Sequence, residues 1–275
     1  LKKFIKIFFK KLLIFKDRSE KKEFFDDLKI IEISNALDIL KNNPVHQTPG
    51  CDSFYKFEKE YSTNTRWNRY AYIAGRIINQ NLMTDESMHL DIGSYYGGLQ
   101  SFLKKKYPEA NYVMVDFPHQ LLRSYIFLKI LYPNSKHIIN EELKSNTLTN
   151  LKDSFIYIPA KNFNLLEKIN FDLVTNFFSF GEMKKKDFLK YFNSKSIINS
   201  KIVYMANRII SAPFFEKTFD SDLNIFDYIN LNSHNVEYFD IFPMGHYTTP
   251  PRILFDTYRA RPISSPYFEC ILKKK

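Results

Sequence analysis

From residue 87 onward, short apolar runs alternate with stretches whose apolar residues recur at helical spacing. This alternation predicts βαβ units, in which parallel strands form one sheet and helices cover both of its faces. The predicted strands are Met88–Ile92, Tyr112–Asp116, Phe155–Ile158, Phe171–Asn176 and Lys201–Ala206. The predicted helices between them are Leu99–Tyr107, His119–Tyr132 and Lys184–Phe192.

The pattern changes again after residue 207. Val236–Phe242 and Pro251–Tyr258 are typical of two strands joined by the turn 243–250, and Tyr267–Lys273 is predicted as a last strand. The predicted fold class is therefore α/β, with a largely parallel sheet and a C-terminal antiparallel hairpin.

The region before this alternation has a different character. Residues 20–42 carry a broken apolar stripe that predicts a helix, residues 44–66 are polar and irregular, and Trp67–Leu82 again shows helical spacing. We expect residues 1–66 to form a helical, basic N-terminal extension and residues 67–275 to form the main domain.

The net charge of +10 is concentrated at the two ends of the chain. Residues 1–22 hold +7 and the last three lysines hold +3, so the body between them is neutral. An enzyme that binds nucleic acid is usually basic across its binding face. We therefore expect no nucleic-acid partner.

Residues 1–16 (LKKFIKIFFKKLLIFK) place lysines between apolar residues at helical spacing. This pattern fits a basic amphipathic helix on an anionic membrane surface, and equally a helix docked on the domain or on a partner subunit. The apolar runs are too short to span a bilayer and do not resemble a secretory signal. We expect a cytoplasmic protein, with peripheral association at the inner membrane face as the membrane alternative. The sequence does not predict the oligomeric state.

The segment 88–98 (MHLDIGSYYGG) is where we expect ligand chemistry. Three of the seven glycines in the chain fall within residues 93–98, between a predicted strand and a predicted helix. Free amide groups at a helix start commonly bind nucleotide-type ligands. However, the spacing G-x-x-x-G-G differs from the dinucleotide fingerprint, and Asp91 repels a pyrophosphate but suits a cationic ligand.

A second acid, Asp116, ends the next predicted strand. It follows the glycine loop at about the interval expected of an acid that accepts hydrogen bonds from ribose hydroxyls. The structural alternative for Asp91 is a cap on the following turn. Because open α/β sheets bind ligands beyond the carboxyl ends of their strands, the residues after the later strands are also candidates.

The Asp-x-Gly-x-x-x-Gly loop followed by Asp116 resembles the class I S-adenosylmethionine (SAM)-dependent methyltransferases. Three segments resemble, more specifically, a bacterial family of sugar O-methyltransferases: residues 115–118 (VDFP), residues 171–183 and the pair Asn207-Arg208. The resemblance covers about residues 65–260. It implies a Rossmann-like fold, SAM as the cofactor, and methyl transfer to a hydroxyl of a sugar in a surface glycan or its precursor.

The resemblance also implies roles for individual residues. The pair Tyr95-Tyr96 departs from the family pattern, in which a small residue often stands there. Arg208 is expected to bind an acidic sugar or a phosphate, or else to pair with a structural acid. The implied cofactor-binding residues are Asp91, Gly93, Ser94, Gly97, Asp116, Phe117, Asn176, Phe177 and Ser179, and the implied substrate-binding residues are Asn207 and Arg208.

Methyl transfer to a hydroxyl requires a base that removes its proton. Glu182 and His246 are the candidates, although Glu182 also fits a helix cap and a lone loop histidine is often incidental. No cluster of His, Asp and Glu predicts a metal. Two alternatives remain open: a methyltransferase for another acceptor, such as a small amine or a nucleic acid, and a non-catalytic scaffold in which the two tyrosines block the pocket.

Overall fold

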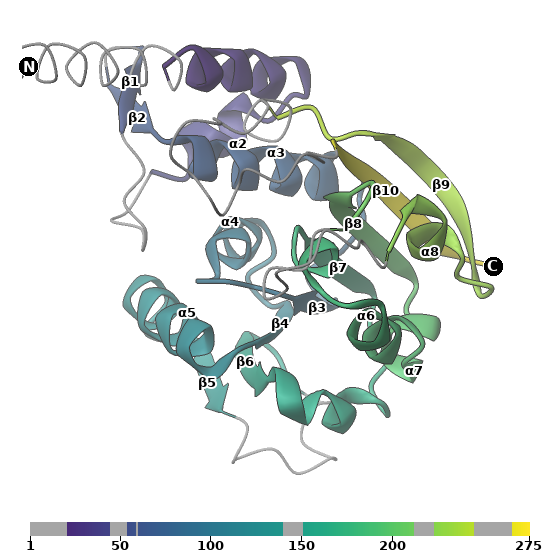
Figure 1. Cartoon of the computed structure of the whole chain (residues 1–275). Coiled ribbons are helices and arrows are strands. Elements are labelled where there is room, and N and C mark those ends of the chain that lie inside the picture. Colours follow the sequence, from purple (N-terminus) through teal and green to yellow (C-terminus); the bar gives the residue numbers. More distant parts are fainter. Residues whose placement is uncertain (1–20, 45–53, 59, 140–150, 212–222, 245–265) are drawn as a thin grey trace, which may run out of the picture. The chain divides into compact units, whose positions relative to one another are not determined.

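A computed structural model describes residues 21–44, 54–58, 60–139, 151–211, 223–244 and 266–275 (Figure 1). The chain divides into two compact units. The first is Leu1–Asn79 with Pro243–Thr249, and the second is Gln80–Phe242 with Pro250–Lys275. The domain boundary that we predicted at residue 66 stays a prediction.

In the first unit, a helix over residues 21–33 is followed by the short helix α2 (Leu37–Lys41). We predicted one helix over residues 20–42, and this was wrong at Asn35, whose φ of 55° is left-handed. Asparagine tolerates this conformation better than most residues. The amide of Ala36 donates to the carbonyl of Ile31 and thereby closes a Schellman-type helix end.

The first unit also contains a hairpin that the sequence did not indicate. Strand β1 (Tyr55–Phe57) pairs antiparallel with β2 (Tyr61–Thr63), in a region that we predicted to be irregular. Helix α3 (Thr65–Asn79) follows. It approaches α2 closely, since a Cβ on Gly75 would lie 2.6 Å from the Cβ of Ala36.

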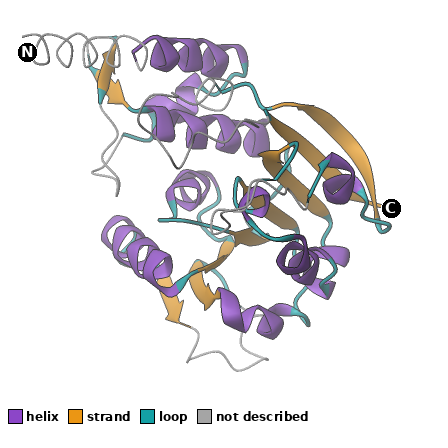
Figure 2. Cartoon of the chain, viewed as in Figure 1, coloured by secondary structure: helices purple, strands orange, loops and turns teal. Residues whose placement is uncertain are grey.

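The second unit is built on a sheet whose described strands number eight, in the order β5-β6-β4-β3-β7-β8-β10-β9 (Figure 2). The first six strands in this order, β5 through to β8 and including β3 and β4, are parallel. Strand β10 is antiparallel to both β8 and β9. The bounds are β3 (Met88–Ile92), β4 (Asn111–Asp116), β5 (Lys136–Ile139), β6 (Ser154–Pro159), β7 (Leu173–Phe177), β8 (Ile202–Arg208), β9 (His234–Ile241) and β10 (Tyr267–Lys274).

This architecture confirms the predicted α/β class with a mostly parallel sheet and an antiparallel hairpin. The hairpin strands are β9 and β10, and the strand predicted over residues 251–258 lies outside the described residues. Within the described part of the chain, no helix is long and apolar enough to cross a membrane.

Helices cover both faces of the sheet, as expected for parallel strands buried on both sides (Figure 1). Helices α4 and α5 lie on one face. The other face packs on the remaining helices through one apolar cluster that includes Val113, Val174, Phe188 and Tyr228. The bounds are α4 (Gly98–Lys106), α5 (Pro118–Leu131), η2 (Ala160–Leu166), η3 (Phe180–Glu182), α6 (Lys185–Phe192), α7 (Lys195–Ile198) and α8 (Ile225–Ile229).

The strand order reverses at β3, and this reversal positions the candidate site. The chain runs outward from β3 through β4 to the edge at β5 and β6, and then returns to β7 on the other side of β3. The loops that follow β3 and β7 therefore leave the sheet in opposite directions. Such a topological switch point is where open α/β sheets bind ligands.

Candidate active site

The glycine loop after β3 turns through three residues with left-handed backbone conformation. Gly93 has a φ of 81°, Tyr95 of 52° and Gly97 of 82°, and α4 begins directly after Gly97. The two glycines adopt this conformation without the steric cost that a side chain would add. The sequence therefore concentrates its glycines where the backbone must turn sharply into a helix start.

Gly93 also lets the loops after β3 and β7 touch. A Cβ at this position would lie 2.3 Å from Ser179 Oγ and 2.6 Å from Ser179 Cβ. Ser179 Oγ in turn donates a hydrogen bond to the carbonyl of Ile92, at 3.2 Å. The structure thus brings together two of the predicted site residues, Gly93 and Ser179, at the switch point. Gly97 makes a similar approach to α5, where a Cβ would lie 2.8 Å from Leu128 Cδ1.

Asp116, at the end of β4, holds the glycine loop in place. Its Oδ2 accepts a hydrogen bond from the amide of Tyr95 and its Oδ1 accepts one from the amide of Phe117, each at 2.7 Å. A carboxylate oxygen has two acceptor sites, so each oxygen retains one for a further donor. Partial burial raises the pKa of Asp116 above its ordinary value, while the two amides oppose this shift. The predicted contact with a ribose fits this geometry and stays a prediction.

Asp91 lies beneath the loop rather than on its surface, at 4% exposure. Gln100 Nε2 donates to its Oδ2 at 2.6 Å, and Thr175 Oγ1 donates to its Oδ1 at 2.7 Å. Burial raises the pKa of Asp91 to about 6, with a smaller contribution from the charge of Asp116. Its hydrogen bonds therefore join β3 to α4 and β7.

A buried histidine completes this polar cluster. His89 Nε2 lies 2.8 Å from Thr175 Oγ1, and burial lowers the pKa of His89 to about 3, so the ring is neutral. Because Thr175 gives its only proton to Asp91, His89 must donate from Nε2. We did not predict roles for His89, Gln100 or Thr175. His89 and Asp91 share a strand face, which sequence alternation does show, but the pairing with Thr175 requires the strand order.

Asn176, at the end of β7, is fully engaged inside the protein. Its Nδ2 donates to the carbonyl of Ile92 at 2.7 Å and to Ser179 Oγ at 2.6 Å. Its Oδ1 accepts from the amide of Phe180 at 3.1 Å and from Asn207 Nδ2 at 3.0 Å. All four of its hydrogen-bonding positions are therefore occupied. Asn176 fixes the loop geometry, and its direct contact with a cofactor stays a prediction.

Asn207, predicted to bind substrate, is also buried and engaged. Its Oδ1 accepts a hydrogen bond from the amide of Gly181 at 3.0 Å, and its Nδ2 bonds Asn176. The pair therefore ties the end of β8 to the loop after β7. Contact of Asn207 with a substrate stays a prediction, as does contact of Phe177, whose ring packs on Tyr204 at 5.0 Å between centroids.

Two further groups near the glycine loop fit a bound ligand. Phe117 is 52% exposed and its ring stacks parallel to His119, at 5.9 Å between centroids. Ser94 is 4% exposed, and its Oγ has no hydrogen-bond partner among the described residues. A flat exposed ring suits an adenine, and a buried hydroxyl without a partner suits a ligand that supplies one.

The two loop tyrosines, which were the unexplained departure from the family pattern, have distinct positions. Tyr96 is fully buried and packs edge-on against Phe127 of α5, at 5.1 Å between centroids. Tyr95 packs on Tyr96, also at 5.1 Å, and is only partly buried. Tyr96 therefore belongs to the layer between the sheet and α5, which explains its size at this position.

Of the two candidate bases, only Glu182 lies in the described part of the chain; His246 lies outside it. Glu182 ends η3, whereas the N-cap of α6 is Lys184, so Glu182 does not cap that helix. Its side chain reaches solvent, yet the surrounding protein desolvates the carboxylate and raises its pKa; Arg208 opposes this shift and Asp116 adds to it. Glu182 is thus within electrostatic range of both residues.

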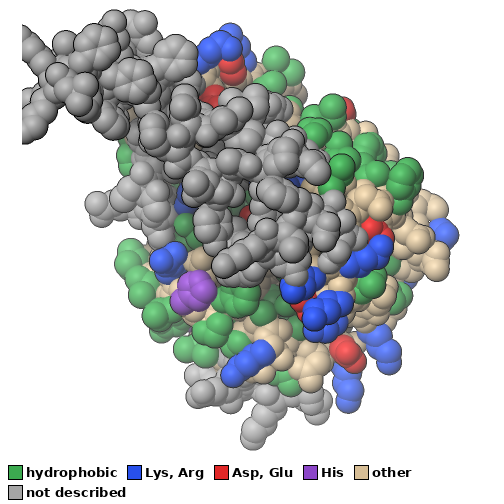
Figure 3. Space-filling view, in the orientation of Figure 1, with side chains coloured by type: hydrophobic (Ala, Val, Ile, Leu, Met, Phe, Trp, Pro, Cys, Tyr) green, Lys and Arg blue, Asp and Glu red, His purple; other side chains and the backbone are tan. Residues whose placement is uncertain are grey.

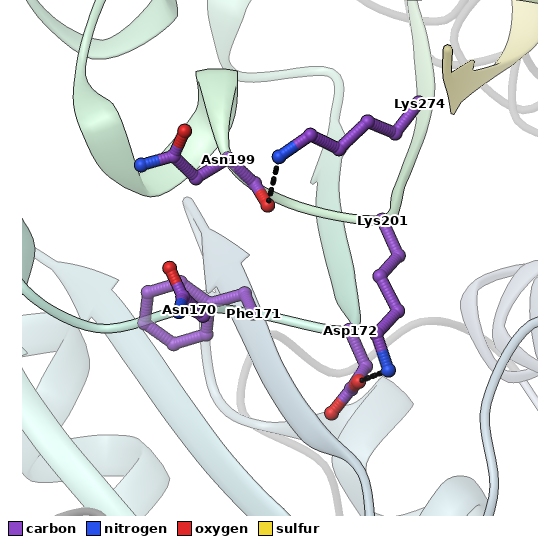
Figure 4. A pocket seen from close by; sticks show the side chains of 6 residues that line it. All are labelled: Asn170, Phe171, Asp172, Asn199, Lys201 and Lys274. Atoms are coloured by element: carbon purple, nitrogen blue, oxygen red, sulfur yellow. Dashed lines mark hydrogen bonds and ion pairs between the residues drawn. The ribbon is translucent and has the colours of Figure 1, made fainter.

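A pocket of about 520 Å³ lies at the opposite end of the strands (Figure 4). Lys201 Nζ pairs with Asp172 Oδ1 at 2.7 Å, and Lys274 Nζ donates to the carbonyl of Asn199 at 3.2 Å. Both lysines are thus engaged by the pocket wall. The residues that line it are Asn170, Phe171, Asp172, Asn199, Lys201 and Lys274.

In the described residues, no group of three or more His, Cys, Asp or Glu is placed to hold a metal ion.

No family model matches the sequence, and no curated protein matches it. Solved structures do match. A protein assigned as a sarcosine dimethylglycine methyltransferase from Galdieria sulphuraria gives a TM-score of 0.50 at 11% identity, covering 91% of this chain and 98% of that chain. Magnesium protoporphyrin IX methyltransferase from Synechocystis PCC 6803, solved with bound SAM, gives 0.46 at 8% identity, covering 77% and 80%. The first of these likenesses shows the fold: the chain has the Rossmann-like fold of methyltransferases.

Proposed function

We propose that this protein is a SAM-dependent methyltransferase that methylates a hydroxyl of a sugar in a surface glycan or its precursor. The observation that supports the proposal is the arrangement of the glycine loop and Asp116 at the switch point. A glycine loop in left-handed conformation touches the loop after β7, and Asp116 holds it with acceptor positions to spare. The exposed ring of Phe117 directly follows Asp116.

The residues of the switch point suit the charge and shape of this cofactor. When bound, SAM supplies a methyl group on a positively charged sulfur. Asp116 would accept from the ribose hydroxyls, Phe117 would stack on the adenine, and Ser94 Oγ would gain the hydrogen-bond partner that it lacks among the described residues. Asp91 and Asp116 interact as like charges, so a ligand with an ammonium and a sulfonium group relieves their repulsion.

Glu182 is our proposed base. A hydroxyl that lies between the cofactor position and η3 would transfer its proton to the Glu182 carboxylate as the new carbon–oxygen bond forms and the methyl carbon–sulfur bond breaks, which would leave S-adenosylhomocysteine. The raised pKa of Glu182 makes it a stronger base than an ordinary surface carboxylate. Alignment of the reacting atoms would supply much of the remaining rate. His246 stays a second candidate from the sequence.

The sugar acceptor rests on the sequence resemblance in residues 115–118 and 171–183 and at the pair Asn207-Arg208. The neighbours named above carry the names of other acceptors, a methylated glycine and a porphyrin. The alternative is therefore a methyltransferase for another acceptor, and the neutral charge of the chain between its two basic ends argues against a nucleic acid.

The test is transfer of a tritiated methyl group from SAM by the purified full chain. Nucleotide sugars, lipid-linked saccharides and intact polysaccharide would serve as acceptors, with small amines and RNA for comparison. We expect label in a sugar as a base-stable ether. Glu182→Gln should slow transfer by about 10²–10⁴-fold, the usual range for loss of a general base. Asp187→Asn, which removes a surface acid paired with Lys190, is the matched control and should leave the rate unchanged.

Label that appears only in the amines or in RNA would contradict the sugar assignment while supporting the enzyme class. Absence of cofactor binding altogether would favour the scaffold alternative over any methyltransferase activity.

We also propose peripheral association with an anionic membrane. The basic segment 1–16 motivates it from sequence but lies outside the described residues. Independent support comes from α5, whose outer face carries a row of exposed apolar residues spaced four apart and contains no acid. Figure 3 shows apolar side chains gathered over α5. The row is Leu122, Ile126 and Ile130, flanked by Arg123 and Lys129. Apolar area with basic flanks is the pattern that binds anionic lipid surfaces.

A further inference from the structure

Arg208, the last residue of β8, is held by a cross-strand partner. Arg208 and Tyr267 face each other in the antiparallel register of β8 and β10. Arg208 Nε donates to the Tyr267 hydroxyl at 2.8 Å, and the guanidinium carbon lies 5.3 Å from the centre of the Tyr267 ring. The hydrogen bond and the cation–π contact together fix the plane of the guanidinium.

The stem of Arg208 is fixed from another direction by the backbone of η3. A Cβ on Gly181 would lie 3.2 Å from the amide nitrogen of Arg208 and 3.4 Å from its Cβ. The amide of Gly181 is itself bonded to Asn207 Oδ1. The Tyr267 ring is also supported, by edge-on packing with Phe178 at 5.4 Å. The side chain has therefore lost most of its freedom before any ligand binds, which lowers the entropic cost of binding.

None of the described residues uses the end of the guanidinium. Arg208 forms no ion pair in the described residues, and no described group bonds its Nη1 or Nη2 atoms. Two other cations do have acidic partners; Lys104 pairs with Asp153, and Lys185 pairs with Asp227 at 2.8 Å. Glu182 interacts with Arg208 only at longer range. Four N–H donors of an immobilised, partly exposed arginine thus remain available at the carboxyl end of β8.

We propose that Arg208 binds an oxyanion, a carboxylate or a phosphate group, carried by the methyl acceptor. This inference rests on the proposed function and narrows its substrate class to acidic acceptors. The guanidinium fork matches either oxyanion with two parallel hydrogen bonds, which orients the acceptor as well as binding it. Tyr267 acts as a positioning residue, because it touches Arg208 and not the acceptor. Glu182, in electrostatic range of Arg208, would then face the hydroxyl of an acceptor held in this way.

The experiment titrates inorganic phosphate and acetate into the whole chain, with and without S-adenosylhomocysteine (SAH), at constant ionic strength maintained with chloride. Binding is followed by calorimetry and by the NMR signal of the Arg208 Nε–H group. We expect saturable binding that shifts this signal and that weakens at least tenfold in Arg208→Gln. Tyr267→Phe keeps the ring but removes the hydroxyl acceptor, and should weaken binding about threefold. The anion that binds with the higher affinity indicates whether the acceptor carries a phosphate or a carboxylate.

The matched control is Arg123→Gln, which removes an exposed arginine from α5. Circular dichroism identifies variants that fail to fold; in that event Arg208→Lys, which keeps the charge but loses the fork, should bind with intermediate affinity. Equal anion affinity in Arg208→Gln and Arg123→Gln, or no saturable binding in the wild type, would overturn the inference. SAH binding is measured in the same samples, so its absence in the wild type would instead overturn the proposed function.

Discussion

Gly93 packs so closely against Ser179 that it leaves no room for a side chain: a Cβ at residue 93 would lie 2.3 Å from Ser179 Oγ. This contact joins the loops that follow β3 and β7, the two strands on either side of the switch point. Gly93 is also left-handed, with a φ of 81°. Two independent constraints therefore exclude a side chain at this position.

Gly93→Ala should consequently destabilise the protein by about 1–3 kcal/mol, since it combines a strained backbone with a steric overlap. Thermal and urea denaturation measure this loss. Gly181→Ala is the comparison, because residue 181 is not left-handed and a Cβ there would lie 3.2 Å from its nearest neighbour, a milder overlap that should cost less stability. A Gly93 variant as stable as the Gly181 variant would show that the two loops are not in fixed contact.

The buried carboxyl of Asp91 should make stability depend on pH. Its pKa is raised from 3.8 to about 6, so between these values the folded protein binds more protons than the unfolded chain. The contribution of Asp91 to stability is present in full below about pH 4 and is lost as pH rises to about 6, by about 3 kcal/mol for this group alone. The lowered pKa of His89 acts in the opposite direction over the same range, because protonation of this buried ring destabilises the folded protein at low pH.

Asp91→Asn should remove this part of the pH dependence. Its amide can still accept from Thr175 and can donate to Gln100 Oε1, a buried atom without a hydrogen-bond partner in the described residues. The measurement is the free energy of unfolding of both proteins at pH 4, 5, 6 and 7. The pKa values of Asp116 and Glu182 are also raised, so both groups contribute to the pH dependence of each protein. The effect of Asp91 is therefore the difference between the wild-type and Asp91→Asn curves of unfolding free energy against pH. Parallel curves would contradict a raised pKa at Asp91.

Membrane association should depend on the outer face of α5. Ile126→Glu combined with Ile130→Glu places two acids in the apolar row, and we expect sedimentation with anionic vesicles to fall at least fivefold. Deletion of residues 1–22 should weaken it as well, because most of the basic charge is lost. The control is Leu189→Glu, which alters an exposed leucine on α6. Unchanged sedimentation in both the double variant and the deletion would refute the membrane role.

The alternation of apolar runs was sufficient to predict β3, β4, β6, β7 and β8, because buried strands require continuous apolar residues. It did not predict the parallel edge strand β5, none of whose four residues is fully buried. It was not sufficient for β1 and β2, which are three residues each and too short to show a period. It also missed the break at Asn35, where a local backbone conformation interrupts an apolar stripe that continues on both sides.

Within the candidate site, the sequence predicted a ligand role for Asp116 and the glycines, since they lie in one short segment or end a strand, and this role stays a prediction. It identified no role for Thr175 or His89, and it assigned Asn176 and Asn207 to ligands although they bond each other. These contacts join residues that are 31 to 86 positions apart. They depend on which strands are neighbours, and a single sequence does not contain that information.

The proposed binding of SAM at the switch point can be measured by calorimetric titration of the whole chain with SAH. We predict a dissociation constant in the micromolar range for the wild type and for Asp187→Asn. Asp116→Ala should bind about 10- to 100-fold more weakly, since hydrogen bonds to a charged group contribute about 1.5–3 kcal/mol. No heat of binding and no thermal stabilisation of the wild type by SAH would show that the switch point does not bind this cofactor.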